Sequence, residues 1–467
     1  MEKSLSQITT VNPATGEDIT TFQAMDKNQV FDLVGKAKRS FPEWKKDYER
    51  RRSYIYNLVE HLKKNKTHLG KIATAEMGKA LKESIGEVEK CAWALEFYAD
   101  HGDSFLSDEV LNTDARKSFL TFEPLGVIGS IMPWNFPYWQ ALRFAAPCLM
   151  AGNVIVMKPS RITMQSGIEI EKAFTESGVP DGVFQTVVGS VDSANHLIDS
   201  DVNAVTFTGS TNAGAKVGER TAMNLKKCVL ELGGSDPFIV LDDAIIEKAA
   251  EGAVKGRFIN CGQSCVASKR FFVGKNIAKD FIELFIKKTS ELKVGDPMSI
   301  ETDVGPVSSK EGLETISGIV EDAKEKGAEI LLGGSEIDGE GFFYKPTILT
   351  NIKPDMRIAK EETFGPVAPI TIVESESEAI KLANDIEFGL GATIWTKDLA
   401  KAEKMSRRID SGIVSVNNVV VSDPRIPFGG IKHSGFGREL SRYGMLEFVN
   451  IKSVRFYDNL VHHHYVE

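Results

Sequence analysis

The chain has 467 residues, more than one ordinary hydrophobic core holds, so we expect two large lobes and a smaller appended element. Apolar residues make up 42% and charged residues 26%, as in soluble globular proteins, and no apolar run is long enough to span a bilayer. The net charge of −9, without a cluster of Lys and Arg, argues against nucleic acid and membrane surfaces as partners.

The amino-terminal segment and the cysteines indicate a cellular compartment. MEKSLSQITTVNPATGE has neither the apolar stretch of a signal peptide nor the arginines of a transit peptide, so we expect a cytoplasmic protein. Five cysteines without a CxxC pair favour neither a disulfide framework nor a zinc site, and we expect no metal. We interpret the three histidines at 462–464 as a solvated tail.

The predicted elements begin with helices over residues 26–102, where apolar residues recur at three- and four-residue intervals. After Leu125, apolar runs alternate with amphipathic segments: GVIGSIM, a helix over 138–149, NVIVM, a helix near 166–177, FQTVVG, AVTFTGS and a further helix. This order predicts a mostly parallel, doubly wound sheet. A second α/β run starts at DPFIVLDD, continues through KRFFVG and ends near VSVNN, which predicts a second lobe.

Two segments with strand character stand outside both lobes. LSDEVLNTDARKSFLTFEP follows the opening helices, and FVNIKSVRFYDN closes the chain. A lone strand needs a partner edge, and we expect another subunit to supply it. The segments therefore predict a small β element for oligomerisation.

A glycine-containing turn is a candidate phosphate site, although neither GxGxxG nor GxxxxGK[ST] occurs. In FTGSTNAG, Gly209 permits a tight turn, Ser210 offers a hydroxyl, and the following helix directs its positive end toward a diphosphate. The alternative is a turn that needs a glycine and a helix cap for structural reasons. Lys158 in VMKPSR ends the preceding strand, where open α/β sheets bind ligands, or is simply solvated.

Four motifs supply the residue types of a reaction site. Cys265 in FINCGQSCVAS follows small residues that leave a thiol accessible, although a buried structural cysteine is the alternative. Asn135 in PWNFP offers an amide for an oxyanion, and Glu231 in LELGG a carboxylate between apolar neighbours. EETFGPV adds Glu362 and Phe364.

With these motifs in this order, the chain resembles the aldehyde dehydrogenase superfamily from NPATGE to FGGIKHSGFGREL. The resemblance rests on PWNFP, KPS, FTGST, ELGG, the FxxxGQxC spacing and ExFGPV. It implies that Cys265 is the nucleophile, Glu231 the general base, and Asn135 with the Cys265 N–H the oxyanion hole. It also implies a set of residues that bind NAD or NADP: Lys158, Ser160, Arg161, Gly209, Ser210, Glu362, Phe364 and Trp134.

The resemblance implies a fold and a reaction as well. We expect two doubly wound α/β lobes plus the small β element: a cofactor-binding domain over 1–105 and 125–233, a catalytic domain over 234–435, and an oligomerisation element over 106–124 and 436–467 of a homodimer or homotetramer. A thiolate adds to an aldehyde, hydride leaves for the nicotinamide, and Glu231 activates water to cleave the thioester. Its presence implies a free acid as product rather than acyl-coenzyme A.

The subfamily and substrate follow from PWNFPYWQALRFAAP and the ending DPRIPFGGIKHSGFGRELSRYGMLEFVNIKSV, which resemble the compact prokaryotic succinate-semialdehyde dehydrogenases. Arg143 and Trp139 share a helix face, and Arg143 is the one charge between Asn135 and Lys158. We hypothesise that Arg143, with Trp139 and Ser264, binds the substrate's terminal carboxylate. The alternative is a salt bridge to a buried carboxylate elsewhere.

Arg161 bears on the choice of cofactor. It stands where many relatives carry a glutamate for the ribose 2′-hydroxyl, and an arginine pairs with a 2′-phosphate, so we expect NADP or NAD with NADP favoured. An arginine turned to solvent is the alternative.

Other interpretations remain open at this point. The chain could be an aldehyde dehydrogenase for glutarate semialdehyde or aliphatic aldehydes, a thiol hydrolase using Cys265 with a histidine, or a catalytically silent relative. Cys261, four residues before Cys265, either packs beneath the site or forms a reversible disulfide with it.

Overall fold

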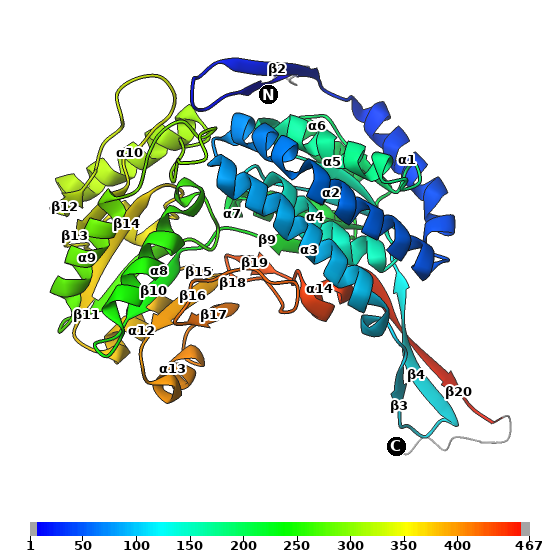
Figure 1. Ribbon diagram of the computed structural model, residues 1–467. Helices are drawn as coiled ribbons and strands as arrows, with labels where there is room; N and C mark the ends of the chain where they lie inside the picture. The colour runs from blue at the N-terminus through cyan, green and yellow to red at the C-terminus, as the bar shows by residue number, and fades with distance from the viewer. Residues whose placement is uncertain (1–6, 459–467) are drawn as a thin grey trace.

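Two α/β lobes, each built on its own sheet, and a narrow arm of three strands make up the fold (Figure 1). The computed structural model describes residues 7–458. The histidines at 462–464 lie outside the described residues. The expected class of two doubly wound lobes plus a small β element is confirmed, and the next paragraphs describe how it places the motifs.

The first lobe contains a six-stranded sheet in the order β19-β9-β8-β5-β6-β7, parallel except for the edge strand β19. Its strands are β5 (Val127–Ile131), β6 (Val154–Lys158), β7 (Phe184–Thr186), β8 (Ala204–Thr208), β9 (Lys227–Glu231) and β19 (Gly435–Phe436). The central strands are buried along their whole length, as expected for parallel strands covered on both faces. The winding direction reverses between β5 and β8, and ligands bind at the carboxyl ends of strands at such a switch point.

Seven helices surround this sheet (Figure 1). They are α1 (Lys27–Trp44), α2 (Tyr48–Met77), α3 (Leu81–Phe105), α4 (Pro137–Met150), α5 (Met164–Glu176), α6 (Val191–Asp199) and α7 (Thr211–Met223). The start of α4 is held by the buried Glu87 carboxylate, which accepts from Tyr138 N and Trp139 N at 2.8 Å and pairs with the buried Lys79. This anchor fixes the backbone just after PWNFP.

The second lobe contains a seven-stranded sheet in the order β12-β13-β14-β11-β10-β16-β17, parallel except for β12. Its strands are β10 (Asp236–Val240), β11 (Ser268–Gly274), β12 (Glu329–Leu332), β13 (Thr347–Thr350), β14 (Val367–Val373), β16 (Gly391–Trp395) and β17 (Ile413–Val416). Side chains alternate between two cores: Phe238 and Val240 pack on one face, and Ile239 packs on the other.

The helices of the second lobe cover both faces of its sheet. They are α8 (Ile246–Phe258), α9 (Ala278–Ser290), α10 (Lys310–Glu325), α11 (Arg357–Lys360), α12 (Glu376–Asn384) and α13 (Leu399–Ser406). A two-stranded pair, β15 (Phe388–Gly389) with β18 (Ile431–Lys432), lies in the chain that returns to the first lobe. The last helix, α14 (Ser441–Leu446), lies against α3 and α4 of the first lobe.

The arm corrects the expectation for the two outlying strands. β4 (Lys117–Pro124) pairs antiparallel with β20 (Val449–Phe456) along its whole length, and β3 (Glu109–Leu111) pairs on its other side. The strands therefore find their first partners in the same chain rather than in another subunit. Periodicity could not show this, because pairing between segments so far apart in sequence leaves no local signal.

Two further features differ from the expected organisation. The chain begins with a hairpin, β1 (Gln7–Val11) and β2 (Asp18–Gln23), rather than with helices. Its turn bridges the lobes, since Phe342 N donates to Pro13 O at 2.9 Å. In addition, residues 440–448, expected with the carboxyl-terminal strand, pack in the first core through Leu440, Met445 and Phe448.

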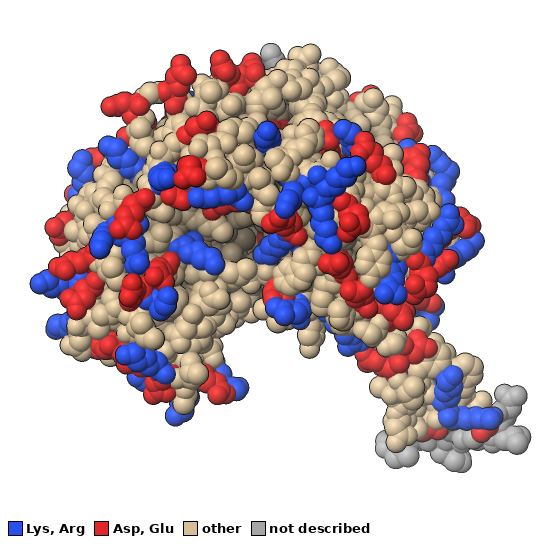
Figure 2. Space-filling view, viewed as in Figure 1, with Lys and Arg blue, Asp and Glu red and all other residues tan. Residues whose placement is uncertain are grey.

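The surface carries no broad area of one charge in the view of Figure 2, where Lys and Arg are interspersed with Asp and Glu. Within residues 7–458, no helix combines the length and the apolar character needed to cross a membrane.

Candidate active site

Cys265 lies in a turn between a strained 3₁₀ segment, Ile259–Gly262, and the start of β11. Asn260, Cys261 and Gly262 all have left-handed φ angles, of 50°, 54° and 71°. A Cβ on Gly262 would lie 2.2 Å from Gly365 O, so a glycine is needed there for space as well as for conformation. Cys261 is buried, and both Cys261 and Cys265 are free thiols. The backbone between them is not a regular α-helix, in which residues four apart would share a face.

Asn135 is brought directly against this turn. Its Nδ2 donates to Gln263 O at 3.1 Å, and Asn260 Nδ2 donates back to Asn135 O at 2.8 Å. Gln263 is in turn anchored by its Oε1, which accepts from Ser308 N at 2.9 Å. The amide of Asn135 has a second N–H, so it retains a donor for an oxyanion.

The thiol of Cys265 lies in an environment that keeps it protonated. Burial raises the pKa of Cys265 to about 11, while the positive charges of Arg143 and Lys269 lower it. Glu362 and Asp236 act in the opposite direction. The balance of charges around the sulfur therefore controls how readily the thiolate forms.

Glu231 ends β9 and is buried, and neither of its carboxylate oxygens has a hydrogen-bond partner within residues 7–458. Burial, and then the neighbouring Glu439, raise the pKa of Glu231 well above its usual range, and Arg143 opposes this. Arg143 forms a buried ion pair with Glu439. This is the salt bridge to a buried carboxylate that was expected from the sequence as the alternative to substrate binding. Its Nη2 nevertheless has no hydrogen-bond partner among the described residues.

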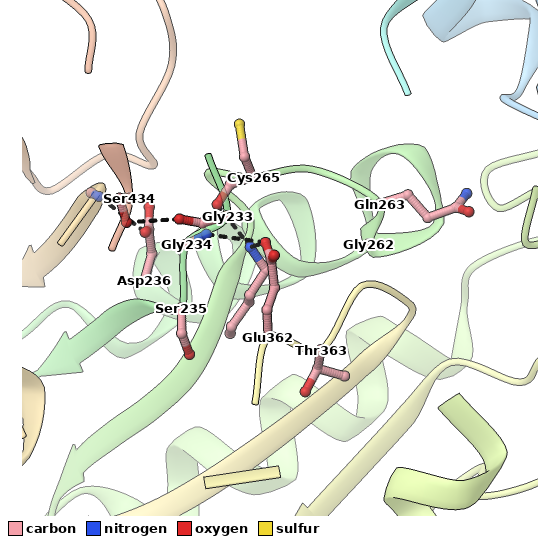
Figure 3. A network of polar contacts seen from close by, with 12 residues as sticks. Gly233, Gly234, Ser235, Asp236, Gly262, Gln263, Cys265, Glu362, Thr363 and Ser434 are labelled. Carbon is pink, nitrogen blue, oxygen red and sulfur yellow. Dashed lines mark hydrogen bonds and ion pairs between the residues drawn. The ribbon is translucent and has the colours of Figure 1, made fainter. Parts of the chain in front are cut away.

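Glu362 is held close to the nucleophile's backbone (Figure 3). Its Oε1 accepts from Gly234 N at 3.1 Å and from Lys269 Nζ at 2.9 Å. Lys269 Nζ also donates to Cys265 O at 2.7 Å. A Cβ on Gly234 would lie 2.8 Å from the same carbonyl oxygen, so the ELGG glycine permits this close approach.

Two aromatic residues expected at the cofactor lie together. Trp134 and Phe364 make an edge-to-face contact, with ring centroids 5.6 Å apart. Phe364 belongs to a loop that Arg257, a fully buried arginine, fastens to the nucleophile turn. The guanidinium donates to backbone carbonyls of both segments, those of Gly262, Ser268, Thr363 and Gly365.

The remaining cofactor candidates lie at the carboxyl edge of the first sheet. Lys158 is buried at the end of β6, and burial and the nearby Arg161 lower the pKa of Lys158 to about 8. Ser160 and Ser210 each cap a helical segment with their side chains. A Cβ on Gly209 would lie 2.5 Å from the Phe207 ring, so packing alone also requires a glycine at this position.

The substrate candidates are all buried. Trp139 packs beneath Lys90, whose Nζ lies 4.3 Å from the ring centroid, and its indole N–H has no partner among the described residues. Ser264 is buried immediately before the nucleophile.

Sequence reasoning missed Lys269, Arg257, Asn260 and Glu439, which tie the site together. A signal existed for Lys269, since SKRFFVG begins a buried strand with two charged residues. Nothing local indicated that Arg257 binds carbonyl groups 106 and 108 residues away in the chain.

The comparisons with known proteins agree with this geometry. A model of the aldehyde dehydrogenase family matches residues 1–454. A probable NADP(+) succinate-semialdehyde dehydrogenase from Synechocystis sp. is 44% identical over 449 residues, which cover 96% of this chain and 99% of that protein. A succinate semialdehyde dehydrogenase of NAD(P)+ type from Escherichia coli is 41% identical over 446 residues, with coverage of 95% and 96%.

A solved structure is similar over the same extent. The succinic semialdehyde dehydrogenase from Streptococcus pyogenes, in complex with NADP+, superposes with a TM-score of 0.94 at 37% identity, covering 97% of this chain and 100% of that one. The matches extend through both lobes and the arm. The chain therefore belongs to the aldehyde dehydrogenase family.

Proposed function

We propose that this chain oxidises succinic semialdehyde to succinate with NADP or NAD, and that it prefers NADP. The observation that carries the proposal is the convergence of Asn135 and Glu362 on the segment that holds Cys265, with Arg143 acting on both the thiol and Glu231. The names of the relatives above support the substrate and the cofactor. An aldehyde dehydrogenase for glutarate semialdehyde or aliphatic aldehydes is the second candidate.

The proposed reaction begins at Cys265. Its thiolate adds to the aldehyde carbon, and Asn135 Nδ2 and the Cys265 N–H stabilise the resulting oxyanion. Bound NADP or NAD would supply the hydride acceptor, and loss of hydride from the thiohemiacetal carbon would leave a thioester on the Cys265 sulfur. Glu231 then takes a proton from a water that attacks the thioester carbon, the C–S bond breaks with its electron pair going to sulfur, the acid leaves, and the Cys265 thiolate is regenerated.

The residues at the carboxyl edge of the first sheet fit a dinucleotide. Lys158 is a buried cation beside a second positive charge, Arg161, and a buried cation needs a polar or anionic partner. We infer that Lys158 and Ser160 hold the adenosine ribose, Gly209 and Ser210 the diphosphate, and Glu362, Phe364 and Trp134 the nicotinamide nucleoside.

The catalytic roles predict two different kinetic defects. Cys265→Ala should abolish reduction of NADP while cofactor binding, followed by quenching of protein fluorescence, is unchanged. Glu231→Gln should give a burst of reduced cofactor and then a steady-state rate lower by about 100-fold or more, because deacylation has lost its base. Stopped-flow absorbance measures both phases, and a full steady-state rate in either variant would contradict the assignment.

The cofactor preference depends on Arg161. Its side chain is 58% exposed and lies 3.7 Å from Glu311, an exposed pair that holds the guanidinium only weakly. We infer that it pairs with the 2′-phosphate of NADP.

Arg161→Glu should lower the ratio of kcat/KM for NADP to that for NAD by about 10-fold or more, because a carboxylate repels the 2′-phosphate. Arg407→Glu makes the same charge change at an exposed position on α13 and should leave the ratio unchanged. An unchanged ratio in Arg161→Glu would show that this residue does not read the phosphate.

The substrate's terminal carboxylate is assigned to Arg143, with Trp139 and Ser264 lining its path. Glu439 neutralises the guanidinium, but the unpartnered Nη2 remains a donor. Removing Arg143 alone would leave Glu439 buried without its cation, at a cost of about 3–5 kcal/mol, and would damage the site for every substrate. A useful test must therefore remove both charges.

The double variant Arg143→Ala/Glu439→Gln, which removes both buried charges, is compared with the wild type on two aldehydes. We expect kcat/KM for succinic semialdehyde to be about 10- to 100-fold lower in the double variant, because a charge-assisted hydrogen bond is lost. Butanal, which has the same chain length and no carboxylate, should be turned over equally by both. Equal losses for both aldehydes would favour the second candidate function.

We also propose that the protein works in the cytoplasm as a homodimer or homotetramer joined through the arm. Both edge strands of the arm expose apolar side chains, among them Val110 at 79% and Ile451 at 52%. Such edges are suited to pairing with another chain.

Sedimentation velocity should therefore give a mass of two or four chains. Ile451→Arg should shift it toward smaller species, because a charge would be buried at the contact. Leu225→Arg, at an apolar residue 96% exposed in the first lobe, is the matched control and should change nothing. A monomeric wild-type chain would contradict the proposal.

A further inference from the structure

We propose that Lys269 is a positioning residue for the reaction: it locks the Glu362 carboxylate to the backbone of the nucleophile and supplies the cation beside the thiol. The proposal rests on the proposed function above. No role was expected for this lysine, which begins the buried strand β11. The argument starts from its contacts.

Lys269 joins two segments that belong to different parts of the site. Its side chain is 1% exposed, and its Nζ donates to Cys265 O at 2.7 Å and to Glu362 Oε1 at 2.9 Å. An ammonium has three N–H donors in a compact head, so one group can serve both acceptors. Figure 3 shows the Cys265, Gly234 and Glu362 groups gathered around these contacts.

The contacts occupy one carboxylate oxygen of Glu362 and leave the other able to accept a hydrogen bond from a ligand. Oε1 accepts from both Gly234 N and Lys269 Nζ. Oε2 is therefore the oxygen able to accept from a sugar hydroxyl. Since Lys269 also holds the carbonyl of Cys265, the ribose carboxylate and the nucleophile cannot move independently of each other.

The strand direction explains why this lysine and not its neighbour has the role. Successive side chains of β11 point to opposite faces of the sheet. Arg270 accordingly turns away and donates to the backbone carbonyls of Ser235, Leu382 and Ala383. Lys269 is thus the cation that β11 directs toward the site.

The charge of Lys269 also acts on the groups around it. The lysine lowers the pKa of the Cys265 thiol. Burial raises the pKa of Asp236 to about 7, and Lys269 opposes this rise. Arg143 also lowers the pKa of the Cys265 thiol, whereas the carboxylates of Glu362 and Asp236 raise it. Loss of the lysine would leave the two carboxylates near the sulfur with Arg143 as the remaining cation, and would disfavour the thiolate.

The test compares Lys269→Met and Lys269→Arg with Lys275→Met, which makes the same change at an exposed lysine just beyond the end of β11. The first measurement is the rate of Cys265 alkylation by iodoacetamide as a function of pH, with the modified peptide located by mass spectrometry. Cys265→Ala sets the background from the other thiols. The second is binding of NADP, followed by fluorescence, together with its KM.

In Lys269→Met, alkylation at neutral pH should be slower by about 10-fold or more, with its pH profile displaced upward, because the thiolate has lost a neighbouring cation. The dissociation constant and KM for NADP should both rise by about 10-fold, since Glu362 is no longer held. Lys269→Arg keeps the charge and should restore the alkylation profile more fully than the NADP affinity. Lys275→Met should match the wild type in every measurement.

A folded Lys269→Met variant with wild-type alkylation and NADP binding would overturn the proposal and leave the lysine a purely structural role. Should Lys269→Met not fold, Lys269→Gln is measured in the same way, and Lys269→Arg then provides the decisive comparison: unchanged NADP affinity there would overturn the positioning role. Alkylation needs no substrate, so failure to oxidise succinic semialdehyde would count against the proposed function alone.

Discussion

Two buried cations join the turn that carries Cys265 to the loop that carries Glu362, and the rest of the candidate site depends on this junction. Arg257 donates only to backbone carbonyls of the two segments, and Lys269 spans a carbonyl of one and a carboxylate of the other. Because a buried charge without acceptors is very costly, the two segments cannot separate without losing that compensation. The buried charges of Arg257 and Lys269 therefore hold the Cys265 turn and the Glu362 loop in place.

A second buried cluster contains the proposed general base. Glu231 and Glu439 lie near one guanidinium, Arg143, in a place from which water is largely excluded. Burial raises the pKa of Glu231, and the second carboxylate, Glu439, raises it further because two carboxylates cannot both ionise easily beside one cation. A raised pKa makes a carboxylate a stronger base than it is in water, which is the property that the proposed role of Glu231 in thioester hydrolysis requires.

The arrangement of the two lobes brings these clusters together. The carboxyl ends of β5, β6 and β8 present Asn135, Lys158 and Ser210, whereas Cys265 comes just before the amino end of β11 in the other lobe. The hairpin at the start of the chain and the return of residues 440–448 to the first core tie the lobes to each other. The site is therefore a product of the whole chain rather than of either sheet.

The sequence by itself determined the lobes and the strand ends, and it indicated the candidate reacting groups, because glycine turns, helix caps and apolar runs act over a few residues. The motifs around Asn135, Glu231 and Cys265 could be recognised on that scale. Only the tertiary structure decided the partners: β20 with β4, Arg143 with Glu439, and Lys269 with Glu362. Each of these pairs joins residues far apart in the chain, and a buried charge takes whichever partner the folded core places within reach, which no local pattern records.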